Sequence, residues 1–201
     1  MRVLITPVFE GNQYQCQLIE TLQHEGINVS TDETVRPPAK LLWRVLRDSP
    51  DVVHIHWIHP YFLFGTKEWP YSIPGGKILA AFFAVIFIAQ VRLTARLCDR
   101  MIWTVHNLRN HENRYPRIDR WVGEQMASAA DLLQVWDEST KAEAADFFRV
   151  PESKLAIVPH GDYPKLAEDS KPLNRREARE KIGISEYDRV LLYFGMIRPY
   201  K

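Results

Sequence analysis

The chain has 201 residues, of which 46% are hydrophobic and 25% charged, and this composition excludes disordered, collagen-like and fibrous proteins. The 26 Lys and Arg residues against 25 Asp and Glu residues give a net charge of +1, so no cationic excess indicates a nucleic-acid partner. The two cysteines, Cys16 and Cys98, match no metal or disulfide spacing. We interpret them as core thiols in a reducing compartment.

Neither the N-terminus nor the longest apolar run predicts secretion or a membrane span. Residues 1–13 (MRVLITPVFEGNQ) lack the long apolar core and the cleavage site of a signal peptide. The apolar run at residues 78–89 (ILAAFFAVIFIA) is shorter than the ~20 residues that cross a bilayer. It predicts a buried or interfacial helix. We expect a cytoplasmic protein, with peripheral contact at the inner face of the plasma membrane as a further hypothesis.

Short β-rich runs alternate with helical stretches, which predicts an α/β fold, a Rossmann-like doubly wound parallel sheet. Two helices are expected at residues 14–25, which Gly26 ends, and from 137 to about 148, with acidic residues in the first turn. The expected strands are apolar runs at residues 3–8, 27–30, 52–57, 101–105, 132–136 and 155–158. Residues 1–160 therefore form one predicted domain.

The sequence changes character after His160. Residues 161–174 are polar and contain prolines, which indicates an interdomain linker. Residues 175–182 predict a short charged helix, and residues 189–195 (RVLLYFG) predict a buried strand. One helix and one strand cannot bury a core. Residues 175–201 are therefore predicted to begin a second domain that this chain does not complete.

The first candidate binding residues are Gly11 and Asn12, between the first strand and the first helix. Free backbone N–H groups and the helix dipole favour anionic or sugar ligands at this position. A tight turn that needs glycine for its backbone angles is an equally good interpretation.

The second candidate is the histidine-rich strand at residues 52–57. A period of two places His54 and His56 on one face, and His59 follows the strand. Two such histidines could chelate a metal ion, but the flanking residues are typical of a core, so we predict no metal. Hydrogen-bonded histidines near the carboxyl edge of the sheet are the better interpretation. His56 and Trp57 are then pocket-floor residues.

The third candidate is the polar end of the strand at residues 101–105. The side chains of His106, Asn107, Arg109, His111 and Glu112 follow it. This convergence suits recognition of a hydroxyl-rich ligand better than nucleophilic catalysis, because no Ser or Cys stands beside the histidine. A solvated loop with one capping histidine is the alternative.

Two amphipathic basic stretches suggest a membrane-facing surface. They are residues 40–47 (KLLWRVLR) and a helix predicted over residues 78–100, where Arg92, Arg96 and Arg100 recur every four residues. Such a face can lie on anionic lipid headgroups. A core helix with a solvated charged face is the alternative.

Four segments together resemble GT-B glycosyltransferases of the family 4 type. They are residues 51–57 (DVVHIHW), 103–112 (WTVHNLRNHE), 158–163 (VPHGDY) and 193–201 (YFGMIRPYK), of which the last is the sharpest match. The resemblance covers essentially the whole chain. It implies two facing Rossmann-like domains, an acceptor-binding N-terminal half and a nucleotide-sugar-binding C-terminal half, with retaining glycosyl transfer in the cleft between them. This chain would supply the first half.

The resemblance also implies roles for individual residues. Gly11 and Asn12 match the first-loop site near the donor phosphates and sugar, and His106 matches the catalytic histidine that contacts the donor sugar. Arg198 and Lys201 match the basic residues that neutralise the departing diphosphate, although Met196 stands where many members carry arginine. No metal ion or other cofactor is implied.

The expected function is therefore that of a hexosyltransferase that uses a nucleotide-sugar donor and a polysaccharide or lipid-linked acceptor. The family's donor-binding pair of glutamates would lie beyond Lys201, so we expect the chain alone to be inactive, as a fragment or truncated gene product. A non-catalytic saccharide- or lipid-binding half-domain, paired with a separate donor-binding half, is the alternative. An NAD-dependent dehydrogenase is disfavoured because the first loop lacks Gly-x-Gly-x-x-Gly.

Overall fold

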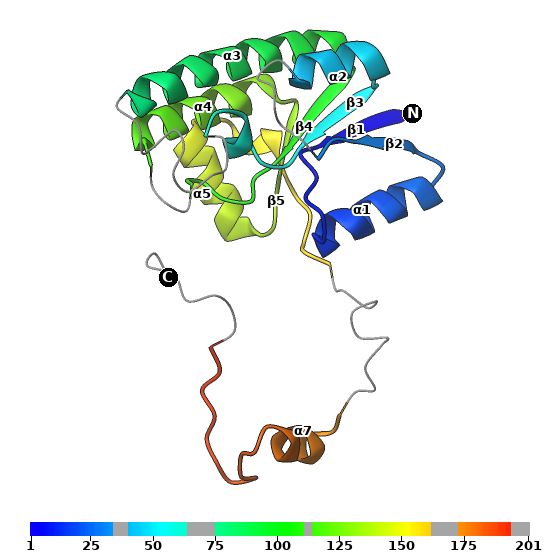
Figure 1. Cartoon of the computed structure of the whole chain (residues 1–201), viewed down its shortest axis with the longest axis vertical. Helices are drawn as coiled ribbons and strands as arrows, with labels where there is room; N and C mark the ends of the chain where they lie inside the picture. The colour runs from blue at the N-terminus through cyan, green and yellow to red at the C-terminus, as the bar shows by residue number, and fades with distance from the viewer. Residues whose placement is uncertain (34–39, 64–74, 111–113, 162–172, 194–201) are drawn as a thin grey trace. The chain divides into compact units, whose positions relative to one another are not determined.

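The structure is a computed structural model that describes residues 1–33, 40–63, 75–110, 114–161 and 173–193. The chain divides into two compact units, Met1–His160 and Gly161–Lys201. The first unit is a six-stranded sheet with helices on its faces (Figure 1), which confirms the predicted α/β Rossmann-like fold.

All neighbouring strands of the sheet are parallel, in the order β2-β1-β3-β4-β5-β6. The strands are β1 (Arg2–Thr6), β2 (Asn28–Thr31), β3 (Val52–Ile55), β4 (Arg100–Thr104), β5 (Leu132–Val135) and β6 (Leu155–Ile157). Five of them end one or two residues earlier than predicted, because the residues that follow leave the ladder at the carboxyl edge.

The helices form two layers, one on each face of the sheet. Helix α1 (Gln13–His24) packs with Leu18 and Ile19 against Val3 and Ile5 of β1. The opposite face is covered by α2 (Lys40–Asp48), α3 (Gly76–Leu97), α4 (Pro116–Ala129) and α5 (Glu138–Phe148), as Figure 1 shows. The described residues of this unit also form two short 3-10 helices, η1 (His59–Tyr61) and η2 (Glu152–Lys154). The main core lies between the sheet and α2 to α5.

Helix α3 is longer than the apolar run from which it was predicted. It has 22 residues, and an 18-residue window within it has a mean hydropathy of 2.1. Among the described residues it is the one helix that could cross a membrane by length and composition, so the expectation that this segment is too short was wrong. Core helices of soluble proteins pass the same test. Its inner residues Ala80, Ala84 and Phe87 lie in the core.

The C-terminus of α3 also corrects a prediction. The helix ends at Leu97, because Cys98 adopts an extended backbone conformation, and Arg100 is the first residue of β4. Arg92 and Arg96 are on the helix, but Arg100 is not, and its guanidinium lies 3.5 Å from the Asp131 carboxylate. The prediction of three arginines on one helical face was therefore wrong for Arg100.

The free cysteines are less buried than predicted. Cys16 on α1 and Cys98 after α3 are both half-buried, so neither is a fully enclosed core thiol. The Cys98 thiol donates to the Thr94 carbonyl at 3.1 Å.

The second unit contains one described helix, α7 (Arg175–Lys181). Asn174 caps its N-terminus by accepting from the Glu177 backbone N–H, and the Glu177 side chain accepts from the Asn174 backbone in return. The predicted strand at residues 189–195 was wrong over its described residues, 189–193, which form no strand and leave Leu191 fully exposed. A strand needs a hydrogen-bonding neighbour, and the described part of this unit contains none.

Candidate functional site at the carboxyl edge of the sheet

Aromatic and histidine side chains follow the carboxyl ends of four neighbouring strands. His56 and Trp57 come after β3, His106 after β4, Trp136 after β5 and His160 after β6. Because parallel strands end at the same edge of a sheet, these rings converge. A tyrosine in the first turn of α1 joins them. We call this set the aromatic–histidine cluster: Tyr14, His56, Trp57, His106, Trp136 and His160.

Two neighbours fix the ring of His106. It stacks on Trp57 with 4.0 Å between ring centroids and 8° between planes. Its Nε2 atom lies 3.1 Å from Nδ1 of His56, a hydrogen-bond distance in which one ring donates and the other accepts. These two contacts give the His106 ring a defined orientation.

Tyr14 is the centre of the cluster. Its ring contacts His56, His106, Trp136 and His160 at centroid distances of 5.7, 5.9, 5.2 and 5.1 Å. These contacts join the first turn of α1 to residues that follow four strands. The ring of Trp136 also packs against His160, at 4.7 Å.

A chain of hydrogen bonds across three strands supports Tyr14. The Thr104 hydroxyl donates to Oε1 of Gln134 at 3.2 Å, and Nε2 of Gln134 donates to the Tyr14 hydroxyl at 3.0 Å. Because the Thr104 proton is used in this way, Nε2 of His54 donates to the Thr104 oxygen at 2.7 Å. Polar residues of β3, β4 and β5 thus hold the cluster from within the sheet.

His54, His56 and His106 are neutral at neutral pH, because the pKa of each imidazole is lowered. Burial lowers the pKa of His54 and of His106 to about 4. Burial, together with the neighbouring His54 and His106, holds the pKa of His56 far below its usual range. A neutral imidazole offers one N–H donor and one nitrogen acceptor, which suits hydroxyl groups.

One ring nitrogen of His56 is buried and forms no hydrogen bond with the described residues. The residue is 1% exposed, and its Nε2 atom has no hydrogen-bond partner among the described residues. Such a buried polar atom costs about 1–3 kcal/mol of stability. The unpaired atom marks His56 as a candidate site residue.

The structure places Gly11 and Asn12 in the loop before α1. Gly11 has a φ of +75°, in the left-handed region that favours glycine, as the tight-turn interpretation expects. Oδ1 of Asn12 accepts from the Gln15 backbone N–H at 3.1 Å and so caps the helix. Both residues precede Tyr14 of the cluster by two or three positions.

The residues predicted after β4 do not all join the cluster. Asn107 is half-buried beside His106 in the chain, whereas the Arg109 guanidinium lies over the Phe147 ring of α5 at 5.1 Å. Four predicted site residues lie outside the described residues: His111, Glu112, Arg198 and Lys201.

A buried carboxylate that the sequence analysis missed holds the loops beside the cluster. Asp119 of α4 accepts from the Asn110 backbone N–H at 2.8 Å and lies 2.8 Å from Nε2 of His59. A signal existed, because Asp119 shares the inner face of α4 with Val122 and Met126. Among the described residues, no group of three or more His, Cys, Asp or Glu side chains is arranged to hold a metal ion.

Four further residues of this region were not predicted from the sequence as site residues: Tyr14, Gln134, Trp136 and His160. Their signal was positional: Tyr14 is in the first turn after the first loop, and Trp136 directly follows a strand. His160 stands in one of the segments that carry the family resemblance.

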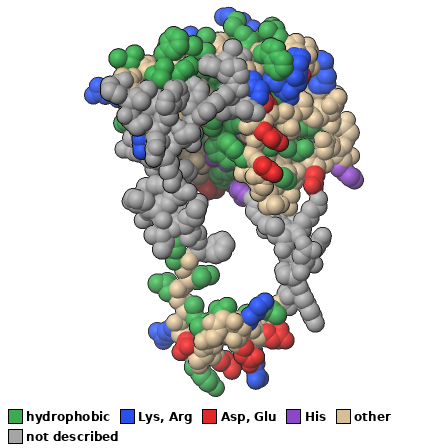
Figure 2. Space-filling view, viewed as in Figure 1, with side chains coloured by type: hydrophobic (Ala, Val, Ile, Leu, Met, Phe, Trp, Pro, Cys, Tyr) green, Lys and Arg blue, Asp and Glu red, His purple; other side chains and the backbone are tan. Residues whose placement is uncertain are grey.

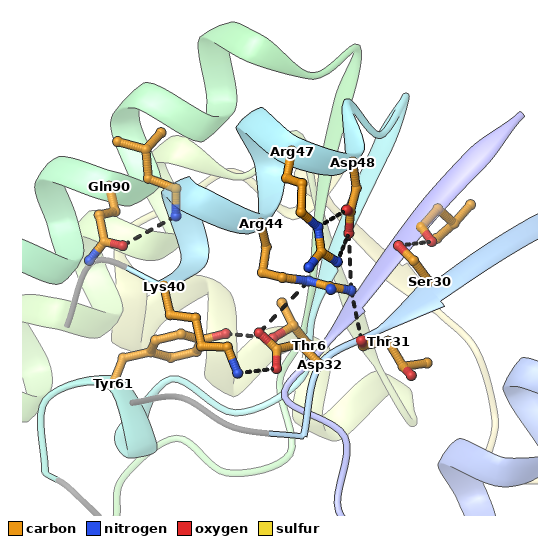
Figure 3. Close-up of polar contacts among 12 residues, drawn as sticks. Thr6, Ser30, Thr31, Asp32, Lys40, Arg44, Arg47, Asp48, Tyr61 and Gln90 are labelled. Atoms are coloured by element: carbon orange, nitrogen blue, oxygen red, sulfur yellow. Dashed lines mark hydrogen bonds and ion pairs between the residues drawn. The ribbon is translucent and has the colours of Figure 1, made fainter. Parts of the chain in front are cut away.

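The acidic residue at the end of β2 is already paired (Figure 3). In dinucleotide-binding folds an acidic residue at this position binds the ribose. Here the buried Asp32 carboxylate lies 2.7 Å from Nζ of Lys40 and 3.9 Å from Nε of Arg44. Arg44 also pairs with Asp48 at 3.0 Å and donates to the Thr31 carbonyl. This network joins α2 to β2 and leaves Asp32 engaged without a ribose.

The structure defines a class by its fold: a doubly wound α/β domain with a cluster of aromatic and histidine side chains at its carboxyl edge. No protein-family model matches the chain, and no curated protein matches it. Among solved structures it is similar to HepE of Anabaena in complex with UDP and glucose, with a TM-score of 0.43 and 12% identity. The match covers 91% of this chain and 50% of that one, so the chain spans about half of that protein's length. A likeness at this level assigns neither family nor activity.

Proposed function

We propose that the protein is a glycosyltransferase and that its first unit binds the sugar. The observation that carries this proposal is His106, a neutral imidazole that stacks on Trp57 and is hydrogen-bonded to His56 at the carboxyl edge. Aromatic rings pack against the faces of sugars, while neutral imidazoles exchange hydrogen bonds with hydroxyl groups. The family resemblance of residues 103–112 supports the same role for His106.

The proposed reaction moves a hexose from a nucleotide-sugar to an acceptor hydroxyl with retention at the anomeric carbon. The bond from the sugar to the diphosphate breaks, the bond to the acceptor oxygen forms, and the hydroxyl proton leaves with the diphosphate. Arg198 and Lys201 are proposed to neutralise the charge that grows on the leaving group, and Gly11 and Asn12 to lie beside it. His106 orients the donor sugar. No metal ion is required, because these cations serve the leaving group.

The proposed acceptor is a polysaccharide or lipid-linked saccharide at the inner face of the plasma membrane, where a cytoplasmic protein meets it. Support comes from the apolar and arginine-bearing outer surface of α2 and α3, which holds Trp43, Phe82 and Arg96. Envelope or exopolysaccharide assembly is the process that such an acceptor would serve.

Sugar transfer by the purified gene product at its natural length tests this proposal. Membrane extract would supply acceptors, and a panel of radiolabelled nucleotide-sugars would supply donors. We expect transfer from one donor and a loss of at least 100-fold on His106→Ala. His24→Ala, at an exposed position of α1, is the matched control and should retain activity. Full activity of His106→Ala would overturn the proposal.

The second candidate function is a non-catalytic saccharide-binding half-domain. The observation that favours it is that every member of the aromatic–histidine cluster lies within Met1–His160. A saccharide that binds this unit, without transfer from any donor by the natural gene product, would support this function over the first.

A further inference from the structure

The outer face of α3 exposes a continuous apolar stripe. Ile78, Phe82 and Val85 are 77%, 58% and 59% exposed, and Leu93 and Leu97 continue the same line. Their spacing follows the 3.6-residue repeat, so they share one face of the helix. The opposite face of α3 is buried in the core. The helix is therefore apolar on two faces, but only one of them packs in the core of the fold.

Neighbouring helices widen this stripe into a surface. Trp43 and Leu46 of α2 and Trp121 of α4 are also exposed. Figure 2 shows hydrophobic side chains along the top of the view, over α2 and α3, with Lys and Arg side chains beside them. We call this the α2–α3 surface: Trp43, Leu46, Ile78, Phe82, Val85, Leu93 and Leu97. Contiguous exposed apolar area of this kind marks an interaction site.

The exposed charges of α3 have one sign. Lys77, Arg92 and Arg96 are exposed on α3, and this helix contains no Asp or Glu. On α2, Arg47 lies with its guanidinium over Trp43 and is paired with Asp48 at 2.6 Å, and the cations that face inward are paired with Asp32 and Asp48. The partner must therefore offer apolar groups and negative charge together.

We infer that the α2–α3 surface docks on an anionic lipid bilayer. Helix α3, about 33 Å long, lies in the plane of the interface, with Phe82 and Val85 at the acyl boundary and Arg92 and Arg96 at the phosphates. This deepens the proposed function, because it brings the sugar site to a membrane-bound acceptor. Docking on the bilayer is inferred from the exposure and the charge of this surface. It can therefore be tested by an experiment that does not measure sugar transfer.

The structure disfavours two other arrangements. A membrane-spanning α3 would have to leave the core, where Phe87, Ile88 and Val91 pack against the sheet side. A second copy docked through α3 would bring cations together without carboxylates from that helix, which is unfavourable. Anionic lipid supplies the missing charge.

A groove between α3 and α4 extends the surface. It has a volume of about 280 Å³ and is lined by apolar side chains that include Val85, Ile118 and Trp121, with Arg117 beside them. Val85 belongs to both the groove and the stripe, so the two are continuous. An acyl chain fits such a lining, and its phosphate fits the arginine.

Vesicle cosedimentation of the 201-residue chain tests this inference. Vesicles of phosphatidylcholine with one third phosphatidylglycerol are compared with pure phosphatidylcholine, at low and high salt. We expect binding to the anionic vesicles, weakened at least tenfold by high salt or by removal of phosphatidylglycerol. The Phe82→Glu, Val85→Glu double variant should lose at least tenfold in affinity. Reversal of Arg92 and Arg96 to Glu should do the same, while replacement by Lys should retain binding.

The matched control carries the same charge change on the opposite face of the sheet. Thr21→Glu with Gln23→Glu on α1, both at exposed positions, should bind vesicles as the wild type does. Absence of binding to anionic vesicles overturns the inference. So does equal loss in the control, or dimerisation through α3 that Phe82→Glu disrupts in the absence of lipid binding. Failure of sugar transfer with intact vesicle binding would instead count against the proposed function alone.

Discussion

The carboxyl edge of the sheet and the α2–α3 surface are built from similar residues but offer different chemistry. At the edge, aromatic rings surround histidines, and the side chains are tied by hydrogen bonds such as His54 to Thr104. On the α2–α3 surface, aromatic and aliphatic side chains are exposed, and the cations of Lys77, Arg92 and Arg96 lie beside them. Neutral donors and acceptors suit a sugar, whereas cations around apolar groups suit a lipid. Both regions combine aromatic rings with nitrogen-bearing side chains. The burial and the charge of those side chains distinguish the ligand that each region suits.

Two phenylalanines of α3 allow the contributions of its two faces to folding stability to be compared. Phe87 is fully buried and stacks with Tyr61 at 4.7 Å, while Phe82 points outward. We expect Phe87→Ala to lower the free energy of unfolding by about 3–5 kcal/mol and Phe82→Ala to change it by less than about 0.5 kcal/mol. Urea denaturation measures both. Comparable losses would mean that the outer face of α3 is packed against protein.

Lowering the pH should affect the two regions differently: it should reduce the stability that the buried histidines provide and leave vesicle binding unchanged. Unfolded histidines titrate near pH 6.5, whereas His54 and His106 titrate near 4 in the folded protein, so the unfolded state binds more protons between these values. Stability from the buried histidines is complete above about pH 6.5 and is lost as the pH falls towards 4. Urea midpoints at several pH values should show this decrease, and His56→Asn should reduce its slope. The sequences of α2 and α3 contain no histidine, so vesicle binding should stay constant over the same range.

The hydrogen bond between His56 and His106 should matter for sugar affinity more than for stability. We expect His56→Phe to weaken binding of the sugar about tenfold, or about 1.4 kcal/mol, because His106 loses its partner. His56→Asn places an amide nitrogen near the position of Nδ1 and should recover most of the affinity. Calorimetric titration with the active donor compares the three proteins. Equal affinity of all three would show that His56 does not orient His106.

Removal of the Tyr14 hydroxyl should give the smallest effect. Tyr14→Phe takes away the acceptor of the Gln134 amide but keeps the ring contacts of the cluster. We expect a loss of about 1 kcal/mol in unfolding free energy and unchanged vesicle binding. Thermal denaturation reports the first and cosedimentation the second. A change in vesicle binding would show that the two regions are coupled.

The strands and their shared edge could be predicted because the relevant signals are local. Each strand is a short apolar run, and polar or aromatic residues such as His56 and His106 follow directly in the sequence. Parallel topology then brings these ends together. Tyr14 could not be assigned in this way, since its place depends on how the first turn of α1 packs over β4 and β5.

The errors arose where tertiary neighbours decide the structure. Arg100 continues the four-residue spacing of the arginines in the sequence. The helix nevertheless ends before it, because the chain turns at Cys98 to enter the sheet. The apolar residues 190–192 read as a strand, but the described part of their unit provides no neighbour to pair with. The exposure of Phe82 and the burial of Phe87 likewise could not be predicted, because the apolar run around them contains no polar residue that would indicate its exposed face.

Histidine ring NMR of the 201-residue chain would show whether the aromatic–histidine cluster binds a sugar. The C–H signals of His56, His106 and His160 would be assigned by single substitutions and followed during titration with nucleotide-sugars and with free saccharides. We expect saturable shifts of the His106 and His56 signals with at least one of these ligands, and an unchanged signal from the exposed His24. Signals of His56 and His106 that do not move with any of them would contradict sugar binding by the cluster.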